Sequence, residues 1–154
     1  MTVRLASVAP DLVDALSGVS EARLRTVARQ VASWAAEEAG LTSDVAVSAL
    51  AQLREWSSDR SVVSADLERE VRGLDEEAWQ IQELAERDES EEGDERKNAD
   101  YVRVFSRARA ASALWFALQE SPRTAAVEAV YEAYAATGDL DRLRAIVEKA
   151  LHGS

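Results

Sequence analysis

The feature that most constrains the fold is the spacing of apolar residues, which recur three or four positions apart along nearly the whole chain. In residues 21–39, for example, Leu24, Val27 and Val31 fall on one side of a helix with 3.6 residues per turn. No segment shows the sustained apolar and polar alternation of a half-buried strand. The sequence therefore predicts an all-α fold, a single compact bundle of six or seven helices.

Short glycine-containing corners separate the apolar stripes. A glycine can close one helix in the left-handed conformation, and a following Ser, Thr or Asp can cap the next helix. We expect such corners at Gly18-Val19-Ser20, Gly40-Leu41-Thr42, Gly73-Leu74-Asp75 and Gly138-Asp139-Leu140-Asp141. The corner at Gly73 is the least determined, because the apolar stripe continues across it and a glycine inside a helix costs only about 1 kcal/mol. Three acids directly after it suit a helix N-terminus, so we expect two helices there.

The corners and stripes together predict the order of the helices. We expect a short helix from Pro10, then helices over residues 21–39 and 44–56, two helices between residue 63 and about 87, one from about 100 to 120, one from Pro122 to Gly138, and one from Leu140 onward. The helix over residues 100–120 is apolar or small around most of its circumference, with Phe105 and Trp115 on its apolar side. It should therefore be central in the bundle.

Length and composition suggest one ordinary globular domain spanning residues 1–154. The 47% apolar and 31% charged residues are typical of such a domain. No apolar run is long enough to cross a membrane, and the N-terminal segment lacks the apolar region of a signal peptide, so we expect a cytoplasmic protein without membrane association. Sixteen arginines against two lysines, together with abundant alanine, are typical of GC-rich bacterial genomes.

The net charge of -11 is concentrated in one short segment. Residues 75–95 carry eleven acids and one base. Proteins that bind nucleic acid usually present a basic stripe to the phosphates, and anionic membrane surfaces attract basic segments. This charge distribution disfavours both nucleic acid and membrane as partners and favours a basic protein partner.

Three interpretations of the acidic segment remain open. Residues 88–99 have no apolar periodicity and contain a glycine, which predicts a solvated acidic loop. The acids could instead pair with arginines just downstream, namely Arg96, Arg103, Arg107 and Arg109. As a third possibility, they could form a docking surface around Trp79, an aromatic residue beside carboxylates that would suit an anchor. The candidate partner-binding residues are Glu76, Trp79, Glu83, Glu86, Asp88, Glu89, Glu91 and Glu92.

Catalytic motifs are few. The single histidine, His152, is close to the end of the sequence, and cysteine is absent, which excludes thiolate chemistry and disulfides. No phosphate-binding loop or nucleophile elbow occurs. Carboxylate pairs resembling those of magnesium-dependent all-α pyrophosphohydrolases do occur, at Glu83-x-x-Glu86, Glu89-x-x-Glu92 and Glu91-x-x-Asp94, but such spacings are nearly unavoidable in so acidic a segment. We therefore expect no cofactor and no metal.

These observations predict a non-enzymatic helical interaction protein. It would bind a basic protein partner and inhibit or neutralise it, as an immunity protein or an antitoxin does. Two alternatives are kept: a magnesium-dependent all-α hydrolase that uses the clustered carboxylates, and a subunit of a helical homodimer.

Overall fold

The computed structural model describes residues 4–56, 61–87 and 91–153, and for residues 87 and 91–97 it describes the backbone alone. Within these ranges every regular element is helical and there is no strand, which confirms the all-α prediction. The elements are a short 3-10 helix, η1 (Arg4–Ser7), and seven α-helices: α1 (Pro10–Leu16), α2 (Glu21–Ala39), α3 (Asp44–Arg54), α4 (Ser61–Arg87), α5 (Glu91–Ala117), α6 (Pro122–Thr137) and α7 (Leu140–His152).

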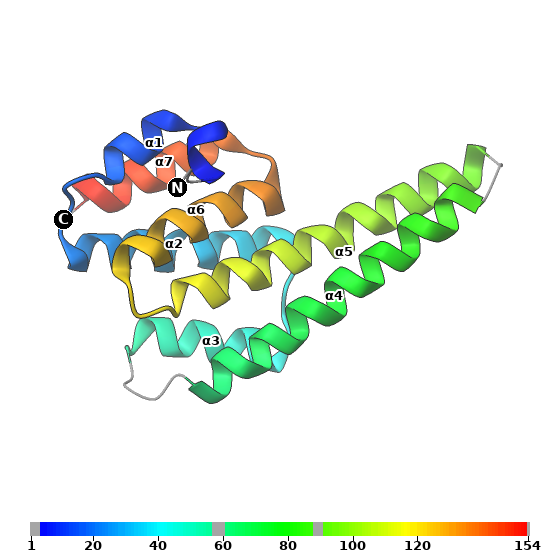
Figure 1. Cartoon of the computed structure of the whole chain (residues 1–154), viewed down its shortest axis with the longest axis horizontal. Helices are drawn as coiled ribbons and strands as arrows, with labels where there is room; N and C mark the ends of the chain where they lie inside the picture. The colour runs from blue at the N-terminus through cyan, green and yellow to red at the C-terminus, as the bar shows by residue number, and fades with distance from the viewer. Residues whose placement is uncertain (1–3, 57–60, 88–90, 154) are drawn as a thin grey trace.

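The helices form a bundle from which one long hairpin projects (Figure 1). Helices α2, α5 and α6 pack against one another in the middle, and α7 lies against α2. Helix α4 runs back along α5, and this pair has the most extensive contact in the described structure. The distal half of the α4 and α5 hairpin extends beyond all the other helices, so there α4 and α5 have only each other to pack against (Figure 1).

The corners follow the chemistry that the sequence predicts. Ser20, Ser43 and Asp139 each accept a hydrogen bond from the backbone N–H three residues on, at 3.3, 3.2 and 3.0 Å, and so cap α2, α3 and α7. Gly40 and Gly138 close α2 and α6 in the left-handed conformation, with φ of 68° and 66°. The corners at these positions are confirmed, with the cap of α3 one residue later than predicted.

The predicted corner at Gly73 is wrong. Helix α4 runs without a break from Ser61 to Arg87, and Gly73 does not have a positive φ. The stripe that includes Leu67, Leu74 and Ala78 continues through the glycine and packs against α5 and the core. Burial of that stripe outweighs the roughly 1 kcal/mol that a glycine costs in a helix interior.

The predicted acidic loop at about 88–99 is wrong from residue 91 onward, because α5 begins at Glu91 rather than near residue 100. Residues 88–90 lie outside the described residues. A helix can begin in this segment without apolar periodicity, because Glu, Lys and Arg have high helix propensity and Glu91, Glu92 and Asp94 lie where the helix dipole favours negative charge. The prediction relied on periodicity, which reports packing against neighbours rather than helicity itself.

The central position predicted for the helix over residues 100–120 is confirmed. Helix α5 contacts α2, α3, α4 and α6, and Leu114 is fully buried on it. Phe105 and Trp115 are only half-buried: Trp115 packs against the core from its edge, and Phe105 stacks on Tyr101 of the same helix. The helix ends at Ala117, three residues earlier than predicted.

The core is made mainly of small side chains. More than half of the buried apolar residues in the described structure are alanines, and most of these lie on α2, α5 and α6. Short side chains allow the axes of neighbouring helices to approach closely. Larger buried residues, among them Leu5, Leu16 and Leu143, surround this centre.

Candidate functional site

The outer face of α4 carries the first half of the predicted partner-binding residues. Glu76, Trp79, Glu83 and Glu86 are spaced by three or four positions, so they lie on one side of the helix, opposite the stripe that packs on α5. Trp79 is 60% exposed, and Glu76 and Glu86 are also exposed, whereas Glu83 is half-buried. We call these four residues the α4 outer face.

Trp79 differs from the other three tryptophans. Trp34 and Trp115 are half-buried and pack against the core, and Trp56 lies under the guanidinium of Arg25, 4.0 Å from its ring centre. Trp79 is more exposed than any of them, which agrees with the sequence prediction that it is an exception. An aromatic side chain with this exposure, surrounded by carboxylates, has the composition of an interface anchor.

The charges along α4 change character at about Gly73. Before it, Arg69 pairs with Asp66 at 3.2 Å and Arg72 pairs with Glu68 at 2.7 Å, so acids and bases offset one another. After it, no base occurs until Arg87. In the part of the hairpin that extends beyond the bundle, α4 therefore carries a strong net negative charge.

The remaining candidates, Asp88, Glu89, Glu91 and Glu92, lie outside the residues whose side chains the structure describes. The backbone of α5 includes the last two. Their role in binding stays a prediction.

The clamp between the acids of the predicted loop and the downstream arginines stays a prediction, because nearly all of those acids lie outside the described side chains, but Arg109 pairs with an acid of α4. Asp75 accepts two hydrogen bonds from Arg109, at 2.7 and 2.8 Å, and Arg109 also donates to Glu132 on α6, at 3.2 Å. Glu132 is only 1% exposed and accepts a further hydrogen bond from Arg4 at 3.1 Å. This charge network joins η1, α4, α5 and α6, and we assign it to the fold.

Arg103 and Arg107, two other arginines considered for the clamp, have different partners. Arg103 pairs with Asp100 on its own helix at 3.0 Å. Arg107 donates to the carbonyl of Ala39 at the end of α2, at 3.4 Å. Arg96 lies outside the described side chains.

Sequence reasoning missed a basic groove that is lined by residues of α2, α3 and α7. Three adjoining cavities of about 590, 350 and 520 Å³ lie along the solvent face of α2, between α7 and α3, and Arg29 lines all three. The cationic side chains that line them are Arg23, Arg25, Arg29, Arg54, Arg142 and Lys149. The three arginines of α2 are visible in its sequence, but Arg54 and the two α7 residues join them only through the tertiary fold.

The chemistry available to the described residues is limited. They contain no group of three or more His, Cys, Asp or Glu side chains that could hold a metal ion. Of the carboxylate pairs considered for magnesium, only Glu83 and Glu86 have described side chains. The magnesium-dependent alternative and the homodimer alternative both stay predictions.

Comparison with known proteins provides no relative from which a function could be transferred: no protein-family model matches the sequence, no curated protein matches it significantly, and no solved structure matches its fold significantly. Among the described residues, none of the helices combines the length and apolar character that a membrane crossing requires. The cytoplasmic location stays a prediction.

Proposed function

We propose that this chain is a non-enzymatic helical interaction protein that binds a basic protein partner through the α4 outer face. Binding would inhibit or neutralise the partner, in the manner of an immunity protein or an antitoxin. The observation that carries the proposal is the exposure of Trp79, because tryptophan is enriched among the residues that dominate binding energy at protein interfaces, and this indole leaves a large apolar surface in contact with water.

The position of Trp79 supports its role as an anchor. Its helix packs on α5 through the opposite side, so a partner can reach the indole without displacing any helix of the bundle. Partner binding through a preformed rigid helix requires little conformational ordering, which favours affinity.

The acids around Trp79 would mainly raise the association rate and select for a basic partner. A concentrated negative field raises the association rate of a basic protein, and this effect weakens as salt screens the charges. Before Gly73, Asp66 and Glu68 are offset by Arg69 and Arg72. The excess negative charge of α4 therefore lies after Gly73, in the distal half of the hairpin.

The test begins with partner capture from a native lysate by four forms of the chain: wild type, Trp79→Ala, the double variant Glu76→Gln and Glu83→Gln, and Val62→Ala. Val62 is the matched control, because it lies on the same helix and is 67% exposed. We expect one basic protein to be retained by wild type and by the Val62→Ala control and to be lost with Trp79→Ala.

Binding kinetics with that purified protein then separate the two roles. Trp79→Ala should weaken the equilibrium affinity by about 2 kcal/mol, or roughly thirtyfold in Kd, mainly through faster dissociation. The glutamine variant should slow association at low salt and differ little from wild type at high salt. If every captured protein binds Trp79→Ala and Val62→Ala equally well, the α4 outer face is not the binding site.

A further inference from the structure

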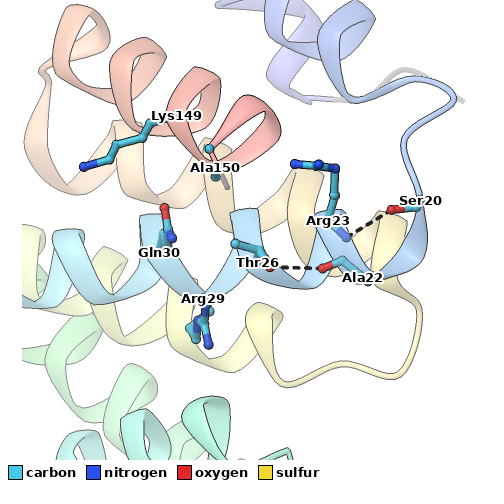
Figure 2. Close-up of a pocket in the computed structure, with 9 residues that line it drawn as sticks. Ser20, Ala22, Arg23, Thr26, Arg29, Gln30, Lys149 and Ala150 are labelled. Carbon is cyan, nitrogen blue, oxygen red and sulfur yellow. Dashed lines mark hydrogen bonds between the residues drawn. The ribbon is translucent and has the colours of Figure 1, made fainter.

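The basic groove along α2 is unexpected in so acidic a chain. Figure 2 shows its first part, in which α2 forms the floor and the C-terminal half of α7 forms one side. The groove continues past Arg29 toward Trp34 and Arg142 and also opens toward α3 at Arg54. Among the residues that line the three cavities, Glu37 is the only acid.

Two of the lining arginines already have structural partners. Arg23 donates to the carbonyl of Leu151 in the last turn of α7. Arg25 donates to the carbonyls of Gln119 and Glu120 just beyond α5. Both satisfy carbonyl groups at or beyond helix C-termini, where cations are favoured by the helix dipole, so the fold itself explains them.

The other four cations bond no described carbonyl group, although Arg54 and Lys149 lie in the last turns of α3 and α7, where the helix dipole favours a cation. Arg29, Arg54, Arg142 and Lys149 have no side-chain hydrogen bond or ion pair with any residue that the structure describes. They come from α2, α3 and α7 and surround one continuous depression. Several positive charges held close together repel one another, and an anionic ligand would remove that repulsion.

Neutral donors lie between these cations. The side chains of Gln30 and Ser33 line the groove, and neither makes a described hydrogen bond. In Figure 2 the amide of Gln30 points from α2 toward the side of the groove where Lys149 lies. Charged guanidinium groups flanked by neutral donors suit a ligand that has both carboxylates and backbone carbonyl groups.

The dimensions of the groove favour an extended ligand over a compact one. The lining residues of α2 run from Ala22 to Glu37, which corresponds to about 22 Å of helix. An extended polypeptide of six or seven residues spans roughly the same length. The three cavities form an open series rather than one enclosed pocket, whereas sites for small molecules usually enclose their ligand.

We propose that this groove binds a short acidic peptide segment of a partner protein, with Arg29 at its centre and Arg54, Arg142 and Lys149 contacting its carboxylates. A nucleic acid fits less well, because its charge continues beyond the groove and would approach a chain with a net charge of -11. This site is distinct from the α4 outer face and does not depend on it.

The test uses a fluorescein-labelled heptapeptide of alternating glutamate and glycine, and the same peptide with glutamine in place of glutamate. Fluorescence anisotropy at low and at physiological ionic strength measures binding to the full chain. We expect the glutamate peptide to bind, more weakly as salt increases, and the glutamine peptide not to bind.

Charge reversal locates the site. Arg29→Glu and Arg54→Glu should each weaken binding of the glutamate peptide by about tenfold or more. Arg69→Glu on α4 is the matched control, because it changes the net charge equally at a side chain outside the groove. It should leave the affinity within about twofold of wild type. Circular dichroism checks folding, and Arg29→Gln replaces any reversal variant that does not fold.

Three results would overturn the proposal. The first is equal binding by wild type and by the folded Arg29 variant. The second is tighter binding of an oligothymidylate than of the glutamate peptide, which would identify a nucleic-acid site. The third is self-association of the wild-type chain that Arg29→Glu abolishes but the glutamate peptide does not inhibit. That result would identify a second copy of the chain as the occupant. Neutralising Glu76 and Glu83 should not weaken peptide binding. The peptide assay therefore tests the groove independently of the proposed function of the α4 outer face.

Discussion

Removing the buried carboxylate of Glu132 is expected to destabilise the fold substantially. Glu132 accepts hydrogen bonds from Arg4 at 3.1 Å and from Arg109 at 3.2 Å, and it is almost completely buried. Breaking a buried ion pair by removing one partner typically costs 3 to 5 kcal/mol, because a charge is left without compensation. We therefore choose Glu132→Leu, which removes the charge at similar volume.

The structure places the expected loss near the lower end of that range. After the substitution Arg4 keeps its ion pair with Glu128, and Arg109 keeps its ion pair with Asp75. The expected decrease in the free energy of unfolding is therefore about 3 kcal/mol, which corresponds to roughly 6 to 12 °C in melting temperature for a domain of this size. Urea denaturation followed by circular dichroism measures it, with a constant m-value as the check on two-state unfolding.

Two further variants test the reasoning. Asp75 is the exposed end of the network, so Asp75→Asn should cost no more than about 1 kcal/mol. Replacing both members of the buried pair, Glu132→Leu with Arg109→Met, should recover much of the loss, because the largely buried guanidinium of Arg109, which after Glu132→Leu has only the exposed Asp75 as partner, is then removed as well. The reasoning is refuted if Glu132→Leu costs less than about 1 kcal/mol, or if the double variant is destabilised by the sum of the two single losses.

Three other predictions follow from the same structure. Gly73→Ala should raise the free energy of unfolding by about 0.5 to 1 kcal/mol, because the glycine lies inside α4 with nothing within 4 Å of an added Cβ. Gly138→Ala should lower the free energy of unfolding, because Gly138 has a φ of 66°. Thermal melting of the two variants tests both expectations. Leu114→Ala should cost about 2 to 5 kcal/mol in urea denaturation, since the side chain is fully buried on the central helix, and an unchanged midpoint would contradict that position. The hydrogen bond from Arg144 lowers the pKa of Asp11, so their contribution to stability is present above the pKa of an unfolded aspartate, about 3.9, and is lost as the pH falls through the lower folded value. Asp11→Asn should therefore be less stable than wild type at neutral pH and equal to it in strong acid, and a gap that persists in acid would rule out the ion pair as its cause.

Much of the fold could be predicted from local sequence signals. The bounds of α2 follow from a serine cap and a terminal glycine, both of which are local chemistry. The continuity of α4 could not be predicted in this way, because the decisive contribution comes from packing against α5, more than twenty residues away in sequence. Helix α5 also began earlier than predicted, because its acidic first turns follow propensity and dipole rather than periodicity.

The candidate sites show the same division between local and tertiary information. The exposure of Trp79 could be predicted from its neighbours on one helix. The basic groove could not, since Arg29, Arg54 and Arg142 are far apart in sequence and their cluster exists only after three helices have packed. Net charge was also misleading there, because an average of -11 conceals a local excess of cations.

The alanine-rich centre of α2, α5 and α6 also affects how stability varies with temperature. An alanine loses almost no rotamer freedom on folding, so this core forms at a low entropic cost per side chain. It also exposes less apolar surface per residue on unfolding than a core of leucine and phenylalanine would, and apolar exposure is what raises the heat capacity of the unfolded state. The curve of unfolding free energy against temperature should therefore be comparatively flat, with the protein keeping a similar margin of stability over a broad thermal range.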